Sequence, residues 1–242
     1  MNTQISNLSE INVAILAGGF GTRLRSAVSG KPKVLAEVNG HPFLEYLLNQ
    51  LNNVHFKKIV LCTRYLSDQV EKTFGKEYKN LHLLYSREQT VLGTAGSLRY
   101  ALPLFTSKII LVMNGDSFCN VDFKKFSQFH VSKKSKVTIV LSKISDTSHF
   151  GKVKLGVDDS ITGFQEKQTG SGSGFANAGI YLISKAFISK IPEDKQLSIE
   201  KDIFSSWIGK GFYGYKNNNS FIDIGTPENY AQAEKFFAQY QL

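Results

Sequence analysis

A glycine-rich segment near the N-terminus carries residue types that bind phosphate. It reads Ala17-Gly18-Gly19-Phe20-Gly21-Thr22-Arg23-Leu24 and directly follows an apolar run. Glycines let backbone N–H groups surround phosphate oxygens, and the guanidinium of Arg23 adds a fork of donors. The spacing differs from the P-loop and from G-x-G-x-x-G, since Leu24 stands where the third glycine belongs. Taken alone, the segment predicts either a phosphate-binding loop or a tight structural turn.

A lysine and two aspartates extend this set of residues. Lys33 follows Pro32 and reaches the glycine-rich segment if the intervening chain folds back. Asp116 comes after the apolar run 109–113, and a carboxylate at the carboxyl end of a strand is well placed to hold Mg²⁺, which prefers oxygen ligands. An Asx turn after the strand is the alternative interpretation. Asp223 ends another short apolar run, so only folding can bring the two aspartates together.

Apolar runs that alternate with helical patterns must position these residues. Strands are expected over 12–17, 58–62, 81–85, 109–113, 137–141, 177–183, 211–215 and 220–224, with a hairpin over 152–157 and 161–164. Helices are expected over 42–51, 94–101, 122–130, 198–207 and 227–240, and another begins at Ser67; Ser67 and Thr226 are the expected N-caps. Strands separated by single helices predict a mostly parallel sheet with helices on both faces and a smaller mixed β insertion in the second half.

Composition restricts the class of protein. The chain has 242 residues, of which 42% are hydrophobic and 20% charged, and this fits one globular domain. The formal charge is +9, but the lysines are scattered, so we expect neither a nucleic-acid nor a membrane partner. The polar N-terminus lacks the pattern of a secretory signal. Two cysteines without metal-ligand spacing are expected to be reduced thiols of a cytoplasmic protein.

The string from Leu16 to Leu24, followed by Pro32-Lys33, closely resembles the signature of sugar-1-phosphate nucleotidyltransferases, and the resemblance extends to about Tyr230. It implies a GT-A-like fold, Rossmann-like with a mostly parallel mixed sheet, in one domain spanning 1–242. Within that domain, it implies a nucleotide-binding part over about 11–135, a sugar-binding part with the closing strands over about 136–225, and a C-terminal helix over 226–242.

The same resemblance implies roles for individual residues. Arg23, Lys33 and Asp116 would be catalytic, and Asp116 and Asp223 would bind Mg²⁺. The implied nucleotide-binding residues are Leu16, Ala17, Gly18, Gly19, Gly21, Thr22, Gly93 and Thr94. The implied sugar-phosphate-binding residues are Gly151, Glu166, Lys167, Asn177 and Glu200. In isolation, several of these positions equally fit a helix start or solvated surface charges.

Substrate choice is indicated by finer similarities. The segments 23–29, 39–46, 114–118, 198–202 and 221–225 look like those of D-glycero-D-manno-heptose 1-phosphate guanylyltransferases, which implies GTP and a heptose 1-phosphate as substrates. Glu88 can accept hydrogen bonds from guanine N1–H and its exocyclic amine, although an ordinary surface position explains it equally well. Mannose 1-phosphate with GTP, N-acetylmuramic acid 1-phosphate with UTP, and a catalytically silent nucleotide-sugar-binding subunit are the alternatives. A monomer or homodimer is expected.

Overall fold

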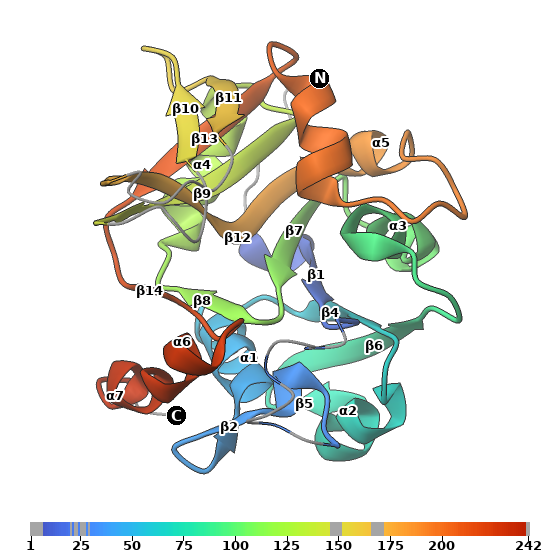
Figure 1. The fold of residues 1–242 in the computed structure, drawn as a ribbon. Coiled ribbons are helices and arrows are strands. Elements are labelled where there is room, and N and C mark those ends of the chain that lie inside the picture. Colours follow the sequence, from blue (N-terminus) through green and yellow to red (C-terminus); the bar gives the residue numbers. More distant parts are fainter. Residues whose placement is uncertain are drawn as a thin grey trace.

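A mixed sheet of eight strands forms the centre of the molecule (Figure 1). The computed structural model describes residues 7–19, 21, 24, 28, 30–145, 152–165 and 172–240. The strands are β1 (Asn12–Leu16), β4 (Lys58–Thr63), β5 (Glu77–Tyr78), β6 (Leu81–Arg87), β7 (Ile109–Asn114), β9 (Val137–Ile144), β12 (Gly174–Ser184) and β13 (Phe212–Asn217). Their order is β13-β9-β12-β7-β1-β4-β6-β5. The fold class expected from the sequence is confirmed.

Strand direction divides the sheet into two parts. β1 runs parallel to β4 and β7, and β4 runs parallel to β6, as expected for a nucleotide-binding half. β12 is antiparallel to both β7 and β9, while β13 is parallel to β9. The predicted hairpin forms from β10 (Lys152–Leu155) and β11 (Ile161–Gln165). The carboxyl ends of β1, β4, β6 and β7 therefore share one edge, where open α/β sheets bind ligands.

Helices cover both faces of the sheet because its strands are apolar on both sides. One core contains Val13 and Ile15 of β1 with buried residues of α1 (Phe43–Asn53), α2 (Ser67–Phe74), α4 (Phe123–Ser132) and α7 (Ala233–Phe237). The opposite core contains Ala14 with residues of α3 (Gly93–Tyr100) and α5 (Lys185–Ile188). Alternate residues of one strand thus point to different cores, as the period of two in a strand requires.

Three helix predictions need correction. Ser67 is the first residue of α2 and not its N-cap; Leu66 occupies that position with a φ of 52°, because a turn separates β4 from the helix. The segment 198–207 is not one regular helix but a π-helix, Ile199–Ile203, followed by the 3₁₀ turn Phe204–Trp207. Its first turn is capped from both sides, since Ser198 N donates to Asp202 Oδ2 at 2.7 Å and Ser198 Oγ accepts from Lys201 N at 3.3 Å. The closing helix is split into α6 (Pro227–Ala231) and α7 at Gln232, although Thr226 caps it as expected.

Small strands complete the fold, and one of them falls within the strand predicted over 220–224. β8 (Ser117–Cys119) pairs antiparallel with β14 (Phe221–Asp223), which joins two segments distant in sequence. β2 (Glu37–Val38) and β3 (His41–Pro42) form a short hairpin before α1. β14 is the predicted strand, whereas β8, β2 and β3 were not predicted because they are too short to show any periodicity in the sequence.

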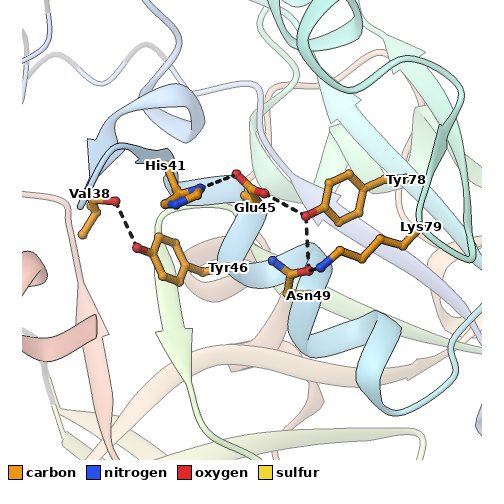
Figure 2. A network of polar contacts seen from close by, with 7 residues as sticks. All are labelled: Val38, His41, Glu45, Tyr46, Asn49, Tyr78 and Lys79. Atoms are coloured by element: carbon orange, nitrogen blue, oxygen red, sulfur yellow. Dashed lines mark hydrogen bonds and ion pairs between the residues drawn. The ribbon is translucent and has the colours of Figure 1, made fainter. Parts of the chain in front are cut away.

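A polar network fastens α1 to its neighbours (Figure 2). The Tyr78 hydroxyl lies 3.0 Å from Glu45 Oε1 and 3.2 Å from Asn49 Oδ1, so its single proton is shared between these two acceptors, and Lys79 Nζ donates to the same Asn49 oxygen at 2.5 Å. His41 Nδ1 lies 3.1 Å from Glu45 Oε2. Burial raises the pKa of Tyr78 to about 12, so its hydroxyl stays protonated at neutral pH. The network holds β3, α1 and the turn after β5 together.

Two further expectations concern the interior. Cys62 and Cys119 are free, buried thiols, and burial raises the pKa of each to about 12. The two thiols lie in opposite cores of the sheet. Among the described helices, none has the length and apolar character that crossing a bilayer requires.

His130 gives the fold a predictable pH dependence. It is 2% exposed, its Nδ1 lies 2.8 Å from Thr138 Oγ1, and burial lowers its pKa from 6.5 to about 4. Between these two pKa values, His130 is protonated in the unfolded chain but neutral in the folded chain. The free energy of unfolding therefore decreases as pH falls from 6.5 towards 4. Over that window, the free energy of unfolding should fall by on the order of 3 kcal/mol more in the wild type than in His130→Asn. Urea unfolding at pH 7.5, 5.5 and 4.5 measures this difference; parallel pH profiles for the two proteins would contradict it.

Candidate active site

The β8–β14 pairing brings the two predicted aspartates to one place. Asp223 lies opposite Ser117 in this ladder, and Ile224 N donates to the backbone oxygen of Asp116 at 2.9 Å. Each aspartate follows or ends a strand at the same corner of the molecule. Chain segments far apart in sequence thus place two carboxylates in adjoining positions, through backbone hydrogen bonds that do not involve the carboxylates themselves.

Lys33 lies in the same corner. Its Nζ is 2.6 Å from Asp116 Oδ2, and the lysine side chain is only 11% exposed. A methyl group built on Gly225 would lie 3.3 Å from Lys33 Nζ and would collide with Asp223 Oδ1. Gly225 N also donates to Asp223 Oδ1. The absence of a side chain at Gly225 therefore lets the ammonium group approach both aspartates.

The glycine-rich segment lies at the carboxyl end of β1, next to this corner. Ala17 N donates to Cys62 O at 2.8 Å and so extends the pairing of β1 with β4. Gly21 has a φ of +58° and lies against the Lys33 side chain. A methyl group added to Gly21 would lie 3.2 Å from Lys33 Cβ. A larger residue at Gly21 would meet both backbone strain and the lysine. Thr22 and Arg23 lie outside the described residues.

A cleft of about 270 Å³ opens along the carboxyl edge of the sheet. Eight of its lining residues were singled out from the sequence: Leu16, Gly18, Gly19, Glu88, Gly93, Thr94, Asp116 and Glu200. Five more were not assigned a role: Arg64, Val91, Ser97, Asn114 and Ser198. Ala17, Gly21, Lys33, Asn177 and Asp223 adjoin the cleft without being among its lining residues. Gly151, Glu166 and Lys167 lie outside the described part of the chain.

One end of the cleft contains a charged and partly buried group of side chains. Glu88 Oε2 accepts from the Ser97 hydroxyl at 2.8 Å, and Glu88 Oε1 would lie 3.1 Å from a methyl group at Gly18. Burial raises the pKa of Glu88, against the opposing effects of the Ser97 hydrogen bond and the Arg64 charge. Arg64 directly follows β4 at the same edge as Gly18. That position after a parallel strand is the signal that would have identified Arg64 from the sequence.

The glycines of α3 have a structural reason as well as a place in the cleft. Gly93 has a φ of +68°, and a methyl group there would lie 2.5 Å from Leu197 O. A methyl group on Gly96 would lie 2.7 Å from Lys195 O. The segment 195–199 runs against the helix start, with Leu197 O accepting from Ala95 N and Thr94 Oγ1 accepting from Ile199 N at 2.8 Å. The Thr94 hydroxyl thereby anchors the segment that leads into Glu200.

The other end of the cleft contains Glu200 and the residues that hold it. Asn177 Nδ2 donates to Glu200 Oε1 at 2.8 Å, and Asn177 Oδ1 accepts from Gly179 N at 2.9 Å. β12 shifts register against β9 between Asn177 and Tyr181, and such a bulge redirects side chains. Gly179 sits in it with a φ of +73°. Asn177 and Glu200, predicted to act together, are thus in direct contact.

The residues present fit a magnesium ion. Within the ranges that the structure describes, no three or more His, Cys, Asp or Glu side chains gather as ligands for a metal. Two carboxylates, Asp116 and Asp223, adjoin beside an open cleft instead. Mg²⁺ is commonly bound by one or two carboxylates together with substrate phosphates and water. The oxygen-only pair suits Mg²⁺ better than Zn²⁺, which favours nitrogen and sulfur ligands.

A mixed α/β sheet with a glycine-rich loop, a lysine and two adjoining aspartates at its carboxyl edge defines an enzyme that handles phosphorylated nucleotides. Sequence comparison specifies the family, because the nucleotidyl transferase pattern matches residues 12–240. The chain therefore belongs to the nucleotidyl transferase family, as its motifs indicated.

Individual relatives cover nearly the whole chain. It is 34% identical over 227 residues to the D-glycero-alpha-D-manno-heptose 1-phosphate guanylyltransferase of Aneurinibacillus thermoaerophilus, covering 93% of this chain and 98% of the relative. It is 30% identical over 227 residues to the mannose-1-phosphate guanylyltransferase of Mycobacterium tuberculosis, covering 92% of this chain and 63% of the relative. The crystal structure of HddC from Yersinia pseudotuberculosis complexed with GMP-PN has a TM-score of 0.82 and 32% identity, over 94% of this chain and 99% of that one.

Proposed function

We propose that this chain transfers GMP from GTP to a sugar 1-phosphate, with D-glycero-D-manno-heptose 1-phosphate as the first-choice acceptor, and releases pyrophosphate. The observation that carries the proposal is the corner where Lys33 Nζ approaches Asp116 and Asp223 beside a cleft. Similarity to a heptose 1-phosphate guanylyltransferase over most of both chains supports the choice of GTP and heptose. The proposal includes Mg²⁺ as cofactor, a cytoplasmic location, and a monomer or homodimer.

The chemistry requires charge stabilisation rather than a general base. A phosphate monoester has a second pKa of about 6, so the sugar phosphate is mostly dianionic at neutral pH and already nucleophilic. One of its oxygens forms a bond to the α-phosphorus of GTP. At the same time, the bond breaks between that phosphorus and the oxygen that bridges the α- and β-phosphates. The electron pair leaves with pyrophosphate. This direct transfer forms no covalent intermediate with the protein.

The protein's part is to hold two anions together and to stabilise the charge that develops. Lys33 supplies a cation, while the amides of Gly18, Gly19 and Gly21, with Arg23, surround the triphosphate in the proposed complex. Mg²⁺ bound by Asp116 and Asp223 would neutralise charge on the phosphates. Glu200 and Asn177 bind the sugar hydroxyls, and Gly151, Glu166 and Lys167 are proposed to complete the sugar-phosphate site.

Glu88 is proposed to select guanine. Its carboxylate offers two acceptors for N1–H and the exocyclic amine, whereas glutamine offers one. Glu88→Gln should raise the KM for GTP by about 10–100-fold, which corresponds to roughly 1.5–3 kcal/mol for a hydrogen bond to a charged group. Because burial raises the pKa of Glu88, the same KM should also rise in the wild type as pH falls through that pKa. Steady-state kinetics tests both, with Glu77→Gln on edge strand β5 as the matched control. A GTP KM within twofold of wild type in Glu88→Gln would remove Glu88 from the site.

The overall proposal is tested by pyrophosphate release over a grid of substrates. GTP, ATP, UTP and dTTP are combined with the 1-phosphates of D-glycero-D-manno-heptose, mannose and N-acetylmuramic acid in the presence of Mg²⁺. The expected result is a maximum for GTP with the heptose. A maximum for mannose 1-phosphate with GTP, or for N-acetylmuramic acid 1-phosphate with UTP, replaces the substrates but keeps the chemistry. Nucleotide binding without turnover in any combination favours a silent subunit instead.

A further inference from the structure

The hydroxyl of Tyr181 lies at the centre of the hydrogen bonds that hold the sugar end of the cleft. Tyr181 is in β12 and is fully buried. Its hydroxyl donates to Glu200 Oε1 at 2.7 Å and accepts from Asn177 Nδ2 at 2.9 Å. Tyr181 lies opposite Val112 of β7 in the sheet, two residues before Asn114. The proposed reaction gives this buried group no part, and a tyrosine within a predicted strand looks like an ordinary core residue.

The donor and acceptor capacities of these groups fix the direction of every bond. A phenolic oxygen has one proton to give and two lone pairs to accept. The Asn177 NH₂ group is a donor only, so it occupies a lone pair, and the single proton must point to Glu200. The hydroxyl thus both donates and accepts, and a buried polar network whose members are satisfied in this way is rigid.

This arrangement leaves one carboxylate oxygen available to a ligand. Both bonds from Asn177 and Tyr181 end on Glu200 Oε1. In the described part of the chain, no hydrogen bond engages Oε2 of this exposed glutamate. Glu200 belongs to a π-helix, and such turns are frequent at functional sites. An exposed carboxylate on an irregular turn needs an external support to keep one orientation, and the Tyr181 hydroxyl supplies it from the rigid sheet.

The strand of Tyr181 connects the acceptor end to the strand that leads to Asp116, because β12 pairs with β7. Asn114 is the last residue of β7, two positions before Asp116. A methyl group on Gly179 would lie 2.7 Å from Asn114 Nδ2, so the bulge glycine makes room for the Asn114 side chain. Glu200 and the start of the Asn114-Gly115-Asp116 turn are therefore held by the paired strands β12 and β7.

We propose that Tyr181 is a positioning residue: its hydroxyl holds the Glu200 carboxylate in the orientation that binds the acceptor sugar, in fixed register with the β7 end that carries Asp116. This inference rests on the proposed function. It concerns the acceptor side alone, so binding of GTP at the opposite end of the cleft is independent of it.

The first test is Tyr181→Phe, which keeps the ring and removes the donor. The KM for the sugar 1-phosphate should rise about tenfold, the size expected for losing one hydrogen bond to a charged group. The KM for GTP should stay within twofold. In a Glu200→Gln background the same substitution should add less than a threefold loss, because the two residues act as a unit.

A packing control separates positioning from a structural role. The Phe204 ring contacts the Tyr181 ring with centroids 5.2 Å apart, so Phe204→Leu disturbs the same packing but keeps the hydroxyl. Its acceptor KM should remain within twofold. If Phe204→Leu raises that KM as much as Tyr181→Phe does, or if Tyr181→Phe leaves it within twofold, the positioning role is wrong.

A measurement on the wild type covers the case in which Tyr181→Phe does not fold. A buried hydroxyl proton donated to a carboxylate should give a slowly exchanging downfield proton resonance, which can be assigned with ring-labelled tyrosine. The resonance should shift when sugar 1-phosphate is added and remain unchanged with GTP alone. No shift on saturation with a turned-over acceptor contradicts the inference alone, whereas a wild type without turnover for any acceptor contradicts the proposed function first.

Discussion

Asp116→Asn is expected to lower kcat by about a thousandfold, the upper range for removing one group that stabilises charge in a transition state. Asp116 joins the segments that form the corner of the site: its carboxylate pairs with Lys33, and its backbone oxygen accepts from Ile224 N. Asparagine keeps the size and the backbone bond. It loses the negative charge that would attract Mg²⁺ and that holds the ammonium group in place.

The measurement is the rate of pyrophosphate release at saturating GTP and sugar 1-phosphate with excess Mg²⁺. Asp122→Asn is the matched control, because Asp122 pairs with Lys125 on the surface and caps α4, a task that asparagine performs equally well. This control should keep kcat within twofold. A kcat for Asp116→Asn above a tenth of the wild-type value would show that the chemistry proceeds without this carboxylate.

Lys33→Met is the second substitution with a large expected effect, a loss of about 100- to 1,000-fold in kcat. Methionine fills the space of the lysine stem but removes the cation that lies 2.6 Å from Asp116 Oδ2. Because the lysine side chain is 11% exposed, bulk water cannot replace its charge at this position. The loss should appear in kcat more than in either KM, since the developing charge is greatest in the transition state.

Lys125→Met removes the exposed partner of a similar ion pair and should leave the rate unchanged. Single-turnover rates separate the chemical step from product release in the comparison of Lys33→Met with this control. Thermal unfolding must accompany the kinetics, because Asp116 loses its counter-charge in Lys33→Met. A folded Lys33→Met protein with a single-turnover rate within threefold of wild type would assign Lys33 a structural role only.

The parallel half of the fold could be predicted because its signals are local. β1 is a short apolar run followed by glycines, and Asp116 follows β7 by two residues. The rule that parallel strands bind ligands at their carboxyl ends then places both at one edge. Glu88 and Arg64 follow the same rule, although only Glu88 was recognised. For these residues, the sequence contains the necessary information in short windows.

The closure of the site could not be predicted in this way. The proximity of Asp223 to Asp116 depends on the pairing of β14, which the sequence predicts, with β8, a strand of three residues that is too short for an alternation pattern. Family resemblance alone assigned Asp223 to the metal. The structural need for glycine at position 93 could likewise not be predicted, because the crowding by Leu197 comes from a segment about a hundred residues later in the chain.

Tyr181 illustrates the same limit at the level of a single atom. Its aromatic ring packs in the core, as an aromatic residue in a strand is expected to do. Its hydroxyl acquires significance only when the π-helix brings Glu200 to it and the bulge in β12 brings Asn177 to it. Hydrogen-bond networks between separate elements have no periodic signature in a sequence, so they must be found in the structure.

The central claim is that two aspartates distant in sequence bind one divalent cation together with the nucleotide. It is tested most directly by calorimetric titration of a non-hydrolysable GTP analogue into the wild type, Asp116→Asn and Asp223→Asn, each with and without Mn²⁺. The account predicts that Mn²⁺ tightens analogue binding to the wild type at least tenfold, and that each variant loses this gain while still binding the metal-free analogue. If either variant keeps the full metal-dependent gain, the two carboxylates do not share the ion and the account is contradicted.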